Sequence, residues 1–128
     1  MASVMAKAKV FPTEDPGKVR QALLNLFPGA DLAEEAGGMT ASTEDLSHFM
    51  EQVRRQRILD AMRATLLRGA EADRTTFCLN KQAAFAGKIS MVEGNVPLGA
   101  VVVTIQDEDL SSLIDRVAPT TVDGEELR

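Results

Sequence analysis

The stretch TTFCLNKQAAFAGKISMVEGNVPLGAVVVTI, residues 75–105, decides the fold. It begins with the β-branched and apolar segment Thr75–Leu79 and ends with the valine run Val101–Ile105, and both segments favour strands. We expect a further strand at Lys88–Val92, followed by a turn region at Glu93–Gly99. Residues 80–87 are first polar and then small, which predicts a connector with one helical turn as its regular structure.

The N-terminal segment predicts another strand. Its alternating positions hold small apolar residues on one side and larger or charged residues on the other; the first set is Val4, Ala6, Ala8 and Val10, and the second is Met5, Lys7, Lys9 and Phe11. This period of two is typical of a strand with one small apolar face and one mixed face. Residues 31–35 and 39–42 flank Gly37-Gly38, which predicts a short polar hairpin.

Helices are expected where apolar residues recur at spacings of three and four. The segments are 15–28, 46–53, 58–69 and 107–117, with Asp15 and Asp107 as N-caps. The apolar face shifts between the second and third segments, which indicates either two consecutive helices or one long helix bent near Arg54–Gln56. The element order β-α-β-β-α-α-β-β-β-α predicts an α+β fold, with helices covering one face of a mostly antiparallel sheet. We expect a single domain over residues 1–119 and an acidic, flexible tail over residues 120–128.

Composition excludes several classes of protein. Hydrophobic residues make up 45% of the 128 residues, which is typical of a globular domain and too apolar for a disordered chain. One cysteine and one histidine exclude an internal disulfide, a multi-cysteine zinc site and a histidine-rich metal cluster. The apolar runs are too short to span a bilayer, and the N-terminus lacks the apolar region of a signal peptide. We therefore expect a cytoplasmic protein with no membrane partner.

No group of residues meets the requirements of a catalytic site. His48 is expected to be exposed, without a serine or cysteine partner, and Cys78 to be a buried, inert thiol within a strand. Gly37-Gly38 lacks the frame of a phosphate-binding loop, and the paired carboxylates are adjacent in sequence and so would not face each other. The expectation is a protein that is not an enzyme and that needs no metal or cofactor.

Charge is unevenly distributed along the chain. The formal net charge is −5, but residues 53–90 carry +5 and the remainder carries −10. The bases of the positive segment are Arg54, Arg55, Arg57, Arg63, Arg68, Arg74, Lys81 and Lys88. The overall acidity argues against a protein that coats nucleic acid indiscriminately, yet it leaves room for one basic face.

Arginines of this segment form the first candidate site. On a single helix, Arg54, Arg57 and Arg68 would fall within roughly a 60° arc, opposite the apolar face. Such a stripe suits phosphate contacts, because the guanidinium group binds phosphate through two parallel hydrogen bonds. The alternative is a solvated helix face whose arginines pair with the surrounding acids.

The second candidate site is the polar segment after Thr75–Leu79. Asn80, Lys81 and Gln82, with Phe85 nearby, could read an unstacked base or hold a phosphate, and Lys88 would extend the basic surface. The alternative interpretation is a capped turn, with Asn80 bonded to local backbone and Phe85 in the core.

Several strings resemble a known family. They are PTED, KV and ALLNLFPGA within residues 12–30, RRQRILDAMRATLLRG, TTFCLNKQAAFAGKISMVE, PLGAVVVTI and LIDRVAP, and the resemblance runs from about Val4 to Pro119. They resemble an archaeal family of uncharacterised proteins that are predicted to bind RNA and in part to associate with the exosome. The resemblance implies an α+β fold similar to that of the ribosomal protein that binds 5S rRNA, and an archaeal cytoplasmic setting. Cys78 and Met91 depart from it, since an aromatic residue and Phe are expected there.

The sequence is compatible with two functions. In the first, the protein is a non-catalytic RNA-binding module for structured RNA, with Arg54, Arg57, Arg68, Lys81 and Lys88 on phosphates and Asn80 and Gln82 as polar contacts. In the second, it is a protein-interaction subunit, either a homo-oligomer or a component of an RNA-processing assembly, whose basic and acidic segments pair across chains.

Overall fold

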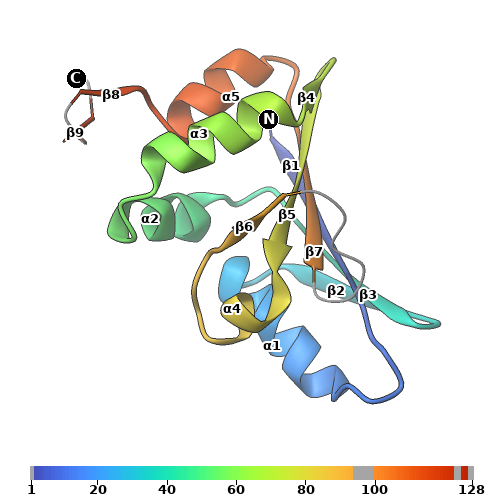
Figure 1. Cartoon of the computed structure of the whole chain (residues 1–128). Coiled ribbons are helices and arrows are strands. Elements are labelled where there is room, and N and C mark those ends of the chain that lie inside the picture. Colours follow the sequence, from blue (N-terminus) through green and yellow to red (C-terminus); the bar gives the residue numbers. More distant parts are fainter. Residues whose placement is uncertain (1, 94–99, 123–124, 127–128) are drawn as a thin grey trace.

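A seven-stranded antiparallel sheet frames the molecule, as the computed structural model in Figure 1 shows. The structure describes residues 2–93, 100–122 and 125–126. The sheet order is β2-β3-β1-β7-β5-β4, and β6 pairs with the same outer edge of β5 as β4 does. The strands are β1 (Ser3–Lys9), β2 (Asp31–Glu35), β3 (Gly38–Thr43), β4 (Ala70–Glu71), β5 (Arg74–Asn80), β6 (Met91–Val92) and β7 (Ala100–Gln106).

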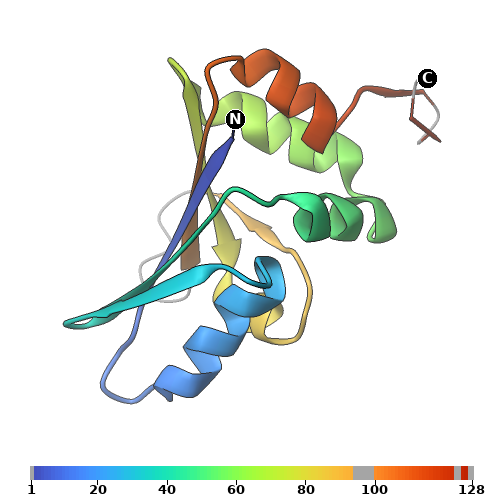
Figure 2. The ribbon, with the colours of Figure 1, turned by 180° about the vertical axis from the view of Figure 1, so that it is seen from behind.

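The five helices of the described chain lie on one side of this sheet, and the view from behind shows the same separation (Figures 1 and 2). They are α1 (Pro16–Leu26), α2 (Ser47–Arg55), α3 (Leu59–Arg68), α4 (Lys81–Phe85) and α5 (Leu110–Val117). None of them is long and apolar enough to cross a membrane. The predicted α+β architecture is thus confirmed, with one sheet face covered by helices.

The core lies between the helices and the sheet face that they cover. Along β1 the small residues Val4, Ala6 and Ala8 are buried and the residues between them are exposed, as the alternation predicts. Three buried phenylalanines join the layers: Phe27 stacks on Phe49 with ring centroids 5.4 Å apart, and Phe49 meets Phe77 of β5 at 6.2 Å. Burying one such side chain contributes roughly 1.5–3 kcal/mol, so this cluster is a main anchor of α2 on the sheet.

Some expected boundaries are corrected by backbone hydrogen bonds. The strand expected at Lys88–Val92 shortens to β6, because the side chain of Gln56 and not a neighbouring strand binds the backbone of Ile89. The N-cap of α5 is Asp109, which accepts a bond from the Ser112 amide, and not Asp107. Asp15 caps α1 as predicted. Most of the turn predicted at Glu93–Gly99 lies outside the described residues.

The segment between the second and third helices forms two helices rather than one bent helix. Arg57 breaks the continuity, because its φ angle of 57° lies in the left-handed region. Arg54 is therefore on α2, Arg57 is in the turn and Arg68 ends α3, so the arc calculated for one continuous helix does not form.

The C-terminal residues form a small separate pairing. β8 (Thr121–Val122) pairs with β9 (Glu125–Glu126), and the Thr121 hydroxyl donates to a carboxylate oxygen of Asp60 on α3 at 2.5 Å. Residues 123–124 and 127–128 lie outside the described residues. The domain boundary at residue 119 and the flexible tail stay predictions.

Candidate nucleic-acid interface

Lys81 is buried and does not extend a basic surface as expected. Its side chain is only 7% exposed, and its Nζ donates to the Lys9 carbonyl at 2.7 Å and to the two carboxylate oxygens of Glu14 at 2.9 and 3.2 Å. Burial acts to raise the pKa of Glu14, but hydrogen bonds from Lys81 and from the Phe11 amide outweigh it, and the pKa is lowered. Lys81 therefore holds the start of α4 to the end of β1, which is a structural role.

The other residues of the polar segment agree only in part with a capped turn. Asn80 caps α4, because its Oδ1 accepts a bond from the Ala83 amide at 2.8 Å, as the capped-turn interpretation predicts. Phe85 is 45% exposed rather than in the core, and the Lys18 ammonium lies 5.8 Å from its ring centroid. Gln82 is exposed on α4.

The candidate arginines and Lys88 do not share one surface. Arg54 is half-buried and donates to the carbonyls of Met50 and Arg116. Arg68 forms an ion pair with Glu93 at 2.5 Å. Hydrogen bonds between Gln56 and Ile89 join the segments that carry Arg57 and Lys88, and we call these two residues the helix-side corner.

The side chain of Gln56 joins the two segments that carry the helix-side corner. The Gln56 amide accepts from the Ile89 amide at 2.7 Å and donates to the Ile89 carbonyl at 2.9 Å. Because Gln56 precedes Arg57 and Ile89 follows Lys88, this clip brings two distant segments side by side. Both cations are exposed, and neither has an ion-pair partner among the described residues.

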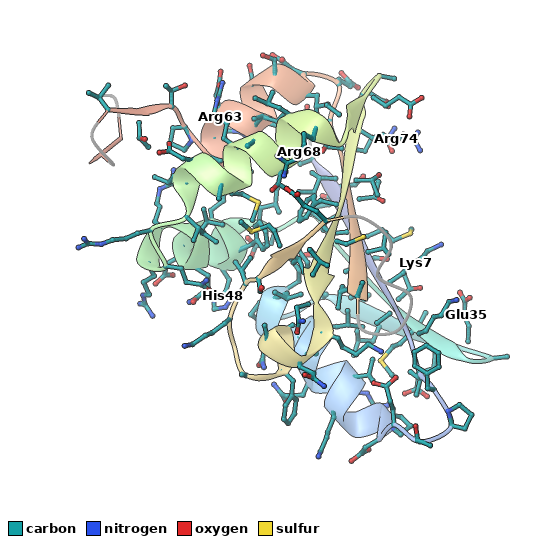
Figure 3. All side chains as sticks on the ribbon, viewed as in Figure 1. Lys7, Glu35, His48, Arg63, Arg68 and Arg74 are labelled. Carbon is teal, nitrogen blue, oxygen red and sulfur yellow. The ribbon has the colours of Figure 1, made fainter. Side chains whose placement is uncertain are left out.

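The opposite sheet face carries no helix in the described chain. We define the open face as the side chains of β1, β3, β5 and β7 that point away from the helices. Strand register sets them in rows, one of them Thr40, Lys7, Val102 and Cys78 and the next Ser42, Met5, Thr104 and Thr76. Figure 3 shows Lys7, Glu35 and Arg74 on this side, whereas His48, Arg63 and Arg68 lie on the helix side.

The centre of the open face is positively charged. Within the described residues no hydrogen bond or ion pair engages the ammonium groups of Lys7 and Lys9, which lie two residues apart on β1, about 7 Å along the strand. Arg74 on β5 is 3.6 Å from Asp73, with both side chains largely exposed. The acids Asp31 and Glu35 lie at the outer edge, on β2.

Hydroxyl groups surround these cations. A hollow of about 880 Å³ lies on the open face. Its lining includes the cations Lys7 and Arg74, the acids Asp31 and Glu44, and the polar residues Ser42, Thr104 and Gln106. Among the described residues, no group of three or more His, Cys, Asp or Glu side chains could hold a metal ion. This surface offers hydroxyl and amide hydrogen-bonding groups beside two cations, with two acids in the same lining.

Sequence reasoning missed Lys7, Lys9 and Arg74 as candidate site residues. The signal was present in the alternation of residues 4–11, since the mixed face of that strand had to point away from the core. Cys78, expected to be buried, is half-buried on the open face, and His48, expected to be exposed, is half-buried on α2. With Cys78 in place of the aromatic residue that the family resemblance implies, the middle rows contain no ring.

A family model, several relatives and solved structures match this chain. A protein-family model described as RNA binding matches residues 3–106. A UPF0201 protein of Metallosphaera sedula is 38% identical over 135 residues, covering 99% of this chain and 94% of the relative, and one of Sulfurisphaera tokodaii is 41% identical, covering 97% and 92%. The crystal structure of a UPF0201 protein from Methanococcus jannaschii superposes with a TM-score of 0.90 at 37% identity, covering 98% of this chain and 99% of that one. A DUF54 structure from Archaeglobus fulgidus, with a TM-score of 0.69 at 21% identity, shows the same fold.

Proposed function

We propose, from the premise that this chain belongs to the archaeal UPF0201 family, that it binds structured RNA without catalysing a reaction on it. The family model described as RNA binding supports the ligand class. The observation that carries the proposal is the unpaired Lys7 and Lys9 at the centre of an uncovered sheet face.

The side chains of the open face favour contacts to the RNA backbone. Lysine and arginine bind phosphate oxygens, and serine and threonine hydroxyls bind phosphates and the ribose 2′-hydroxyl. The middle rows offer no aromatic ring on which a base could stack, so recognition there depends on backbone shape. A double-helical segment presents its phosphates and 2′-hydroxyls in the fixed array that such a face requires.

The test compares two double charge reversals by fluorescence anisotropy with an RNA hairpin. Lys7→Glu/Lys9→Glu changes the open face, and Arg57→Glu/Lys88→Glu changes the helix-side corner by the same net charge. We expect the first pair to lower affinity about tenfold or more and to reduce the salt slope by roughly 1.4–1.8, as the loss of two phosphate contacts requires. The second pair should leave both nearly unchanged.

Comparing the two double variants shows which surface binds the RNA. If the second variant loses binding and the first keeps it, the helix-side corner and not the open face is the interface. If the wild type binds no structured RNA even at low salt, the proposed function is wrong.

The second candidate function is a protein-interaction subunit, in a homo-oligomer or an RNA-processing assembly such as the exosome. The observation that favours it is the edge strand β2, which pairs only with β3 in the described chain and carries Asp31, Glu34 and Glu35. An edge strand offers its unpaired backbone groups to another chain, and its acids select a basic partner. Co-purification from the native host, followed by size-exclusion chromatography at low and high salt, tests this function; a lone monomer at every salt concentration would count against it.

A further inference from the structure

A second hollow lies where β1 leaves the sheet. Its volume is about 570 Å³, within the range of small-ligand sites. We call it the β1 hollow and define it by Lys7, Lys9, Phe11, Glu35, Thr40 and Lys81 among its lining residues. It shares Lys7 with the larger hollow on the open face, so a strand of RNA could pass from one to the other.

Phe11 gives the β1 hollow the aromatic ring that the middle of the open face lacks. The chain has five phenylalanines and no tryptophan or tyrosine. Phe27, Phe49 and Phe77 are buried in the core, and Phe85 lies on α4 at the helix side. Phe11 is therefore the aromatic side chain available to a ligand at the end of β1.

Contacts to Glu14 and Lys81 fix the position of Phe11. Its amide donates to Glu14 Oε1 at 3.1 Å, and its carbonyl accepts from the Glu14 amide at 2.9 Å. The buried Lys81 ammonium lies 5.2 Å from the ring centroid, in a cation–π contact. These contacts hold the ring in place before any ligand binds, which reduces the entropy lost on binding.

The charges around the ring match the two halves of a nucleotide. The ammonium groups of Lys7 and Lys9 form no hydrogen bond or ion pair among the described residues and can hold a phosphate group. Glu35 lines the same hollow, and its carboxylate would repel a second phosphate and can accept a hydrogen bond from the amino group of a base. Thr40 adds a hydroxyl for the ribose.

We propose that the β1 hollow binds one unpaired nucleotide of the RNA, with its base on the Phe11 ring and its phosphate at Lys7 and Lys9. This proposal rests on the proposed function. It specifies the ligand as RNA with an unpaired nucleotide beside a double-helical segment, which the open face holds. Lys81 and Glu14 are positioning residues for the ring.

The test uses one RNA hairpin in two forms, blunt or with a three-nucleotide single-stranded overhang. Base stacking on an aromatic side chain contributes roughly a 5- to 150-fold gain in affinity, so the wild type should bind the overhang form more tightly by a factor in that range. Phe11→Leu should bind both forms as the wild type binds the blunt one. The matched control Phe85→Leu, which changes the other partly exposed ring, should keep the preference.

Phe11→Trp supplies a second readout, because it places the single tryptophan of the chain in the hollow. The overhang hairpin should change the tryptophan fluorescence, and the blunt hairpin and free AMP at the same concentration should not. If Phe11→Leu still binds the overhang hairpin more tightly than the blunt one, the proposal is wrong. It is also wrong if free AMP changes the tryptophan fluorescence of Phe11→Trp as much as the overhang hairpin does. Binding of both hairpins without any preference would also overturn it while the proposed function stands; binding of neither would overturn the proposed function itself.

Discussion

The carboxylate of Glu14 and the ammonium group of Lys81 join two segments that are 67 residues apart. A charge as buried as that of Lys81 is tolerated only when a partner of opposite charge and hydrogen-bond acceptors surround it. Here Glu14 and the Lys9 carbonyl meet both requirements, and no buried side-chain polar atom in the described residues lacks a hydrogen-bond partner.

Glu14→Gln is expected to destabilise the fold by up to about 3–5 kcal/mol at neutral pH, because it leaves the Lys81 charge without its counter-ion. The matched control is Glu34→Gln, which breaks the exposed ion pair with Arg20 and should cost less than about 1 kcal/mol. Urea denaturation of both variants measures the difference. Equal costs would contradict a structural role for the buried pair.

The same pair predicts a pH dependence. The pKa of Glu14 is lowered in the folded protein, so its stabilising effect is fully present above the ordinary glutamate value of 4.5. It is lost as the pH falls through the lower, folded-state pKa. The stability difference between wild type and Glu14→Gln should therefore shrink as urea denaturation is repeated from pH 6 downward, and a constant difference would contradict the assignment.

At the scale of elements, the turn between α2 and α3 decides where the basic residues lie. The left-handed Arg57 ends one helix, and the Gln56 side chain attaches the turn to Ile89. Gln56→Ala removes both hydrogen bonds to Ile89 and leaves the amide and carbonyl of this buried residue without these partners. We therefore expect the free energy of unfolding to fall by about 1–3 kcal/mol. Gln52→Ala, on the preceding helix α2, is the control, and thermal denaturation compares the two variants. An equal, small effect would mean that the bonds of Gln56 to Ile89 contribute nothing to stability.

The helix and strand order could be predicted because each periodic pattern is local. The small face of β1 and the helical spacing in α1 are visible in the printed sequence. The fate of Lys81 could not be predicted, since its partner Glu14 is distant in sequence and only the packing of α4 brings them together. The segments that carry Arg57 and Lys88 are likewise joined by hydrogen bonds of the Gln56 side chain to Ile89, which no spacing rule encodes.

The two faces of the sheet differ in what they carry. Helices and the core occupy one side of the sheet, and on the other side strand register sets cations of β1 and β5 among hydroxyl groups. The net charge of −5 does not exclude an anionic ligand on the open face, because the ammonium groups of Lys7 and Lys9 form no hydrogen bond or ion pair among the described residues. We expect the RNA backbone to lie over β1, β7 and β5, because Asp31 and Glu35 on the edge strand β2 repel phosphates.

The most direct test of this arrangement is a chemical-shift map of the ¹⁵N-labelled protein titrated with an overhang hairpin at low salt. If RNA binds the open face, the amide signals that move will belong to β1, β3, β5 and β7, with the largest shifts from Lys7 to Phe11. Shifts confined to the α2–α3 turn and residues 86–90 would contradict it and assign binding to the helix-side corner.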